Sequence, residues 1–76
     1  MTIDLESEKT KLLKKKIEED KAIGERLRQK RIARNMKASW VAAELGLTPP
    51  YISDLENGRR HWNAELIERY EQVLRK

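Results

Sequence analysis

Hydrophobic residues in the middle of the chain recur with helical spacing in two short groups. Val41, Ala42 and Leu45 form the first group, and Ile52 and Leu55 form the second. Apolar positions three and four residues apart mark one face of an α-helix. The pattern therefore predicts two short helices that each bury one face.

The residues between and around these groups predict where the helices begin and end. Gly46 tolerates the positive φ of a tight turn. Thr48 is a suitable N-cap, and the two prolines that follow suit a first helical turn, where a missing N–H costs nothing. Because Pro49 precedes another proline and is biased away from the helical region, we expect the second helix over about residues 50–56, with Gly58 just beyond its end. Two short helices joined by a glycine turn describe a helix-turn-helix.

Longer amphipathic segments flank this pair. The first is expected at about residues 21–34, with Asp20 as a candidate N-cap, and the second at about residues 64–75, with Asn63 as N-cap. The first short helix should start near Ala38, or later if Ser39 caps it. The side chains expected to face the core from the connection and the flanking helices are Ile23, Leu27, Ile32, Met36, Leu66, Ile67, Tyr70, Val73 and Leu74.

The spacing of these residues resembles the helix-turn-helix of phage Cro and repressor-like regulators, also called the Xre type. Counted from Ala38, the matching positions are Val41, Ala42, Leu45, Gly46, Leu47, Ile52 and Leu55. The segment Ile23–Arg31 looks like the first helix of that family, DLENGRR (Asp54–Arg60) looks like its characteristic ending, and the resemblance covers roughly Ile23–Leu74. It implies an all-α fold: a compact four- or five-helix lambda-repressor-like DNA-binding domain, with the helix-turn-helix as helices 2 and 3 and an N-terminal helical arm.

The first 20 residues form a charged arm ahead of the domain expected at residues 21–76. Leu5, Leu12, Leu13 and Ile17 are spaced for an amphipathic helix with a thin apolar stripe. The arm could be a solvated or disordered tail, a helix that packs on the domain or pairs with another copy, or an extension of helix 1. Trp40 lies where relatives carry a charged residue, so we expect Leu12, Leu13 or Ile17 to cover it, or else a partner surface.

Composition and charge narrow the function. The chain has 76 residues, enough for one domain, with no cysteine and one histidine, so we expect no disulfide, metal or cofactor. No apolar run is long enough to cross a membrane and no secretory signal is recognisable. The net charge of +4 falls within residues 23–62, where eight Arg or Lys residues oppose four acids, as binding to a polyanion requires.

The resemblance implies that helix 3 enters the major groove of double-stranded DNA. The side chains nearest the base edges would be Thr48, Pro49, Pro50, Tyr51, Ser53 and Asp54. These residues offer few of the bidentate contacts that read purines, so readout of DNA shape would contribute. The residues expected at or near the DNA backbone are Lys37, Ser39, Asn57, Arg59, Arg60 and His61.

Arg31 and Glu56 stand where the family places an ion pair between helix 1 and the end of helix 3. Such a pair would fix the recognition helix against the scaffold. The alternative is two ordinary exposed charges on separate helices.

The sequence predicts a non-enzymatic DNA-binding transcriptional regulator. Ser53 and Asp54 are helix neighbours that do not face each other, so they form no catalytic group with His61. We expect a repressor that binds a two-fold operator as a homodimer, in the cytoplasm and nucleoid of a bacterium or its phage. The alternative is an antitoxin or protein-interaction module that docks a partner through the arm or Trp40. A membrane-surface role is disfavoured because the acids of the arm cancel its lysines.

Overall fold

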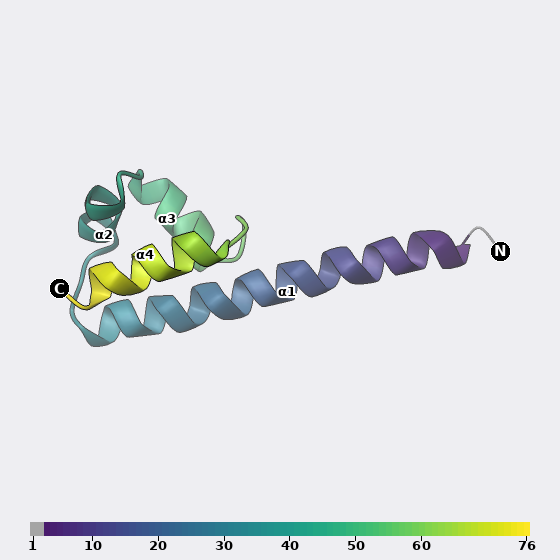
Figure 1. Ribbon diagram of the computed structural model, residues 1–76, viewed down its shortest axis with the longest axis horizontal. Coiled ribbons are helices and arrows are strands. Elements are labelled where there is room, and N and C mark those ends of the chain that lie inside the picture. The colour runs from purple at the N-terminus through teal and green to yellow at the C-terminus, as the bar shows by residue number, and fades with distance from the viewer. Residues whose placement is uncertain (1–2) are drawn as a thin grey trace.

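The computed structural model describes residues 3–76, and their side chains from residue 16 onward. Within this part of the chain there are four helices and no strand: α1 (Ile3–Ala33), α2 (Ala38–Leu45), α3 (Pro49–Glu56) and α4 (Ala64–Leu74). Figure 1 shows α4 beside the C-terminal half of α1; α3 packs directly against α1 and α2, and α2 also packs against α4. The prediction of an all-α domain with a helix-turn-helix is confirmed.

The turn between α2 and α3 forms as the sequence predicts. Gly46 has a φ of 71°, and the N–H of Leu47 donates to the carbonyl of Ala42 at 2.8 Å. This arrangement satisfies a carbonyl at the end of α2 and reverses the chain. Asn35, at the end of α1, also has a positive φ of 57°, which asparagine tolerates better than most residues.

One predicted helix start, that of α3, was wrong by one residue, and the predicted start of α2 is confirmed. Helix α3 begins at Pro49 rather than Pro50, so the bias that Pro50 places on the residue before it is overridden here. Thr48 is the extended N-cap residue, and its hydroxyl accepts the N–H of Tyr51 at 3.4 Å. Helix α2 begins at Ala38 with Lys37 as its N-cap residue. Ser39 therefore lies inside the first turn and is not a late cap.

A single core joins the four helices. Its buried hydrophobic residues are Leu27, Val41, Ala42, Leu45, Ile52, Leu55, Trp62, Tyr70, Val73 and Leu74, and Ile23, Met36, Leu66 and Ile67 pack against it. Trp62 was not expected there. Its ring is buried and contacts that of Tyr70 edge to face, with 5.4 Å between centroids, and its indole N–H donates to the carbonyl of Leu55 at 2.8 Å.

Helix α1 turns two of its three predicted apolar residues inward, since Leu27 is completely buried and Ile23 packs against the core. Ile32 is 43% exposed, so its expected place in the core was wrong. The inward stripe is instead Asp20, Gly24, Leu27 and Arg31, spaced four, three and four residues apart. Asp20 lies within the helix and is not its N-cap. Hydrogen bonds to α3 and the following turn decide this orientation, and hydropathy does not encode them.

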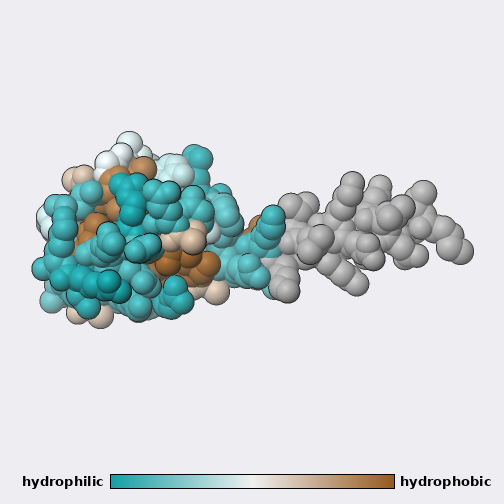
Figure 2. All heavy atoms as spheres, viewed as in Figure 1, coloured by the Kyte–Doolittle hydropathy of each residue, from teal (hydrophilic) through white to brown (hydrophobic). Residues whose placement is uncertain are grey.

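The arm and helix 1 form one continuous helix across residues 20 and 21. Its N-terminal half extends away from the other three helices, on the side opposite α2, so it closes no core face near α2 (Figure 1). Ile17 is 49% exposed and Trp40 is 41% exposed, so Ile17 does not cover Trp40. The side chains of Leu12 and Leu13 lie outside the described residues. Figure 2 shows a mostly hydrophilic surface over the described part of this face, with small hydrophobic patches.

Candidate nucleic-acid interface

Helix α3 has a buried side and an open side. Ile52 and Leu55 are completely buried, whereas Pro49, Pro50 and Ser53 are exposed. Thr48 is also exposed, and Tyr51 and Asp54 are partly exposed. In the described part of the chain, the six side chains expected nearest to base edges therefore share a surface that the rest of the fold leaves accessible.

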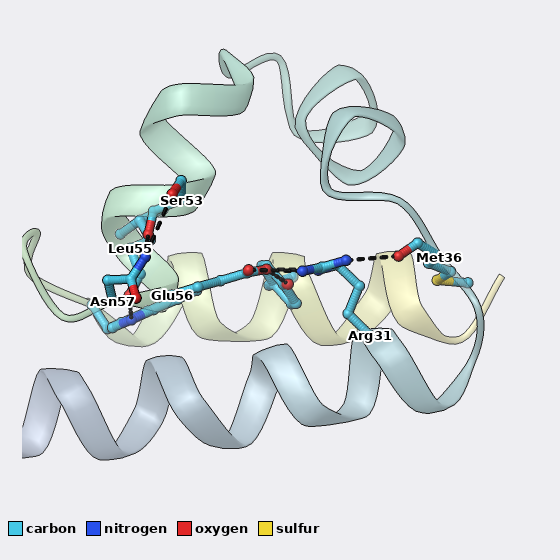
Figure 3. A network of polar contacts seen from close by, with 8 residues as sticks. Arg31, Met36, Ser53, Leu55, Glu56 and Asn57 are labelled. Carbon is cyan, nitrogen blue, oxygen red and sulfur yellow. Dashed lines mark hydrogen bonds and ion pairs between the residues drawn. The ribbon is translucent and has the colours of Figure 1, made fainter.

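A buried ionic network holds the C-terminal end of α3. Arg31 donates from Nε and Nη2 to the two carboxylate oxygens of Glu56, at 2.8 and 2.9 Å, and from Nη1 to the carbonyl of Met36 at 2.8 Å (Figure 3). The hydroxyl of Tyr70 donates to Glu56 Oε2. The two residues expected to form an ion pair are thus in contact, with side-chain exposures of 12% and 4%. The network ties α1, α3, α4 and the α1–α2 connection to one carboxylate.

This environment alters two pKa values. The hydrogen bond from Arg31 to Glu56 raises the pKa of the guanidinium, against the opposing effect of burial. Burial, followed by the bond to Glu56, raises the pKa of the Tyr70 hydroxyl far above its ordinary value. Arg31 therefore stays charged and Tyr70 stays a hydrogen-bond donor at neutral pH.

The last turn of α3 is closed by Asn57. Its side-chain amide donates to the carbonyl of Ser53 at 2.8 Å and approaches the Ser53 hydroxyl at 3.4 Å (Figure 3). In this conformation one Asn57 amide hydrogen is occupied within the helix. The exposed Ser53 hydroxyl lies on the open side of α3.

The basic turn after α3 folds back onto that helix. Arg59 Nη1 lies 3.3 Å from Asp54 Oδ1, and Arg60 Nε lies 3.8 Å from Asp54 Oδ2. The Arg60 guanidinium also lies over the ring of Tyr51, 4.7 Å from its centroid. Both arginines remain more than half exposed, so the turn offers cations to solvent next to the open side of α3.

Helix α1 anchors the end of this turn. The carboxylate of Asp20 accepts the N–H of Trp62 at 3.0 Å, and His61 Nδ1 lies 3.2 Å from the same oxygen. The imidazole is 69% exposed, and its partner is Asp20 rather than Ser53 or Asp54. His61 and the N–H of Trp62 therefore hold the end of the turn against Asp20 of α1.

Gly24 and Gly58 allow α1 to approach this closely. A Cβ on Gly24 would lie 2.5 Å from the carbonyl oxygen of Leu55, and one on Gly58 would lie 2.8 Å from the Cα of Lys21. Gly58 also has a φ of 75°. Neither glycine can gain a side chain without moving α1 away from the end of α3.

The remaining expected contacts lie at the start of α2. Lys37 and Ser39 are exposed there, and the N-cap Lys37 gives the helix no side-chain hydrogen bond. Sequence reasoning missed Asp20, Gly24, Trp62 and Tyr70 as supports of the site. Gly24 lies within Ile23–Arg31, the segment that resembles the first helix of the family, but its role as a support was not anticipated.

Two other kinds of site are absent from the described residues. That part of the chain holds no group of three or more His, Cys, Asp or Glu side chains that could bind a metal ion. Its helices also lack the length and apolar character needed to span a bilayer.

Comparison with known families agrees with this geometry. The helix-turn-helix domain family matches residues 22–75, which include the last part of α1 and all of α2, α3 and α4. The chain belongs to the helix-turn-helix domain family. No curated protein and no solved structure matches the chain significantly.

Proposed function

We propose that the protein is a non-enzymatic transcriptional regulator that binds double-stranded DNA through α3 in the major groove. The observation that carries this proposal is the two-sided character of α3, whose inner side is locked by Ile52, Leu55 and Glu56 while its outer side stays open. A helix held in this way can enter a groove without losing its support.

The two ends of α3 carry side chains that can make different contacts with DNA. Thr48, Pro49, Pro50 and Tyr51 are at the N-terminal end, which docks nearest the bases, and the prolines can contact only thymine methyl groups. Ser53 and Asp54 can hydrogen-bond bases. This set reads few positions directly, so we infer that DNA shape contributes to recognition.

Phosphate contacts would come from both sides of α3. Arg59, Arg60 and His61 follow its C-terminal end, and Asn57 closes that end. Lys37 and Ser39 are exposed at the start of α2. Such contacts position the protein and make its affinity depend on salt.

We further propose that the regulator acts as a repressor and binds a two-fold operator as a homodimer. One motif of this size contacts too few base pairs to be both tight and selective, and two-fold symmetry doubles the contacts. The expected setting is the cytoplasm of a bacterium, or of a cell carrying its phage, with the protein on the nucleoid when bound.

Selection of bound duplexes from a random pool, followed by titration at several salt concentrations, tests DNA binding. The test variant is Arg59→Ala plus Arg60→Ala. The control, Arg28→Ala plus Arg75→Ala, removes the same charge from exposed positions on α1 and beyond α4. If each test arginine neutralises one phosphate, the slope of log K against log salt should become shallower by about 0.9 for each arginine removed.

The control should leave the slope nearly unchanged. Equal effects of the two variants would mean that only total charge matters, and binding without salt dependence would refute phosphate anchoring. The mass of the protein in solution, measured with and without a selected duplex, tests the homodimer.

A second candidate function is a protein-interaction module, such as an antitoxin that docks its partner through Trp40 or the N-terminal arm. The supporting observation is the groove of about 440 Å³ beside Trp40, which Asn35, Met36, Lys37 and Lys76 complete. An indole that is 41% exposed next to two lysines fits a partner with acidic and apolar side chains.

The variant Trp40→Ser separates the two functions. The regulator proposal expects DNA affinity close to that of the parent protein, because Trp40 is not among the expected contact residues. Weak, salt-insensitive DNA binding by the parent protein, together with binding of a different protein that Trp40→Ser abolishes, would favour the interaction module.

A further inference from the structure

We propose that Asp54 determines the sequence selectivity of α3. In the free protein its carboxylate holds Arg59 and Arg60. It releases these arginines to DNA phosphates where a base presents an amino group that the Asp54 carboxylate can bind instead. This inference rests on the proposed binding of α3 in the major groove. In this proposal the Asp54 carboxylate makes binding to some sequences stronger than binding to others.

The first observation is that Asp54 already has two cationic partners. Arg59 Nη1 and Arg60 Nε lie 3.3 and 3.8 Å from its two oxygens, and Arg60 also stacks on Tyr51. The backbone N–H of Arg59 donates to the carbonyl of Asp54 at 2.8 Å, which brings the turn close to this side chain. The two arginines best placed to grip phosphate are therefore held by an acid on α3 itself.

The second observation is that Asp54 is the one acid of α3 that can meet DNA. The helix has the sequence PPYISDLE, and its other acid, Glu56, is buried against Arg31 and Tyr70. The Asp54 side chain is 33% exposed, on the side that carries the basic turn. Any effect of a negative charge of α3 on the approach of a duplex must therefore come from Asp54.

These contacts create a competition when a duplex binds. A phosphate that takes Arg59 or Arg60 leaves the Asp54 carboxylate with fewer partners, in the negative field of the DNA backbone. The major groove can restore a partner only through an amino group, which cytosine offers at N4 and adenine at N6. A guanine or thymine edge at that place presents acceptors, which repel the carboxylate.

The competition has a different outcome on the two kinds of duplex. On a duplex that presents an amino group to Asp54, the arginines are free to bind phosphate and the carboxylate is satisfied by the base. On other duplexes, either the arginines stay with Asp54 or the carboxylate is left unpaired, and both arrangements weaken binding. Asp54 thus raises selectivity mainly by weakening non-selective complexes.

The variant Asp54→Asn tests this inference, because it keeps the size of the side chain and removes its charge. The matched control is Glu68→Gln, which removes one exposed acid from α4. Asp54→Ser serves as a second test variant, and thermal unfolding of all four proteins verifies that they fold. Each is titrated with a random duplex and with a selected duplex, and each is used to select duplexes from a random pool.

On the random duplex in 0.1 M salt, Asp54→Asn should bind roughly tenfold more tightly than the parent, since about one additional phosphate contact becomes available. Glu68→Gln should change affinity less than about twofold, because salt screens a distant exposed charge. The parent should select cytosine or adenine at one position, and exchanging that base pair should weaken parental binding roughly tenfold or more. The pool selected by Asp54→Asn should be less restricted at that position.

The inference is overturned if Asp54→Asn and Asp54→Ser behave like Glu68→Gln on the random duplex, or if the selected position is unchanged in both. In that case salt-dependent binding by the parent would still support the proposed function. If the parent binds no duplex in a salt-dependent way, the proposed function fails and this inference fails with it.

Discussion

Removing Arg31 should destabilise the domain more than any single surface change, because it leaves a buried charge without its partner. Arg31 makes two hydrogen bonds to Glu56, at 2.8 and 2.9 Å, and the Glu56 side chain is only 4% exposed. In Arg31→Met, which keeps the aliphatic stem, Glu56 loses both of these bonds and, among the described side chains, retains the hydroxyl of Tyr70. Breaking one side of a buried ion pair costs about 3–5 kcal/mol, a large part of the roughly 5–15 kcal/mol that stabilises a domain.

The size of this destabilisation distinguishes a buried charge from poorer packing. The triple variant Arg31→Met, Glu56→Leu and Tyr70→Phe removes every polar member of the network at the side-chain level. It should be more stable than Arg31→Met alone, because no charge or hydroxyl is left buried without a partner. A triple variant that is more stable than Arg31→Met therefore indicates that the cost of Arg31→Met comes from the unpaired carboxylate.

The free energy of unfolding, measured by urea titration monitored by circular dichroism, provides the assay. The control is Glu44→Gln, which breaks the ion pair between Glu44 and Lys76 at 2.7 Å. That pair is exposed, so breaking it should cost no more than about 1 kcal/mol. A cost below about 1 kcal/mol for Arg31→Met, or a triple variant less stable than Arg31→Met, would refute the reasoning.

Three further perturbations test other supports of the site. Gly24→Ala should destabilise the protein by about 1–3 kcal/mol in urea titration, because the added Cβ would lie 2.5 Å from a backbone carbonyl oxygen of α3. This loss is expected although alanine favours helices more than glycine does. Unchanged or increased stability would contradict this packing. Asp20→Ala should cost about 1–3 kcal/mol and alter Trp62 fluorescence, since the buried N–H of Trp62 loses its acceptor; an unchanged spectrum and stability would exclude that anchor. Folding raises the pKa of Tyr70, so the contribution of Tyr70 to stability is complete below its unfolded pKa of about 10 and declines as the pH rises above that value. In a Tyr51→Phe background, tyrosinate absorbance should show that Tyr70 ionises well above pH 10. Ionisation near pH 10 would contradict the buried hydroxyl.

The helix-turn-helix could be predicted in detail because local physics fixes it. Gly46 has the positive φ that the turn needs, and Thr48 and Asn63 accept backbone N–H groups at the starts of α3 and α4. The apolar residues of α2 and α3 are buried as their spacing indicates. Each of these features depends on residues a few positions apart, so one sequence contains the information.

The supports of the site could not be predicted in the same way, because they join residues far apart in the chain. Trp62 was not among the predicted core residues, yet it fills the core beneath the basic turn. Asp20 was considered as a helix cap, yet its acceptor capacity is used by the N–H of Trp62, 42 residues later. A short polar side chain carries no periodic signal that reveals such a partner. Of the long-range contacts, only the Arg31–Glu56 pair was anticipated, through the family resemblance.

The orientation of α1 explains why the hydrophobic pattern was least informative there. Its inward stripe consists of Asp20, Gly24, Leu27 and Arg31, so three of the four positions are polar or lack a side chain. Each of these three residues holds a different part of α3 and the basic turn: Asp20 holds the end of the basic turn, Gly24 admits the end of α3, and Arg31 binds the last residue of α3. Turning α1 to bury Ile32 in place of this stripe would expose Leu27, which is completely buried, and would break all three of these interactions. The face of α1 is therefore chosen by what α3 needs to stay in position, and an isoleucine remains in solvent as the consequence.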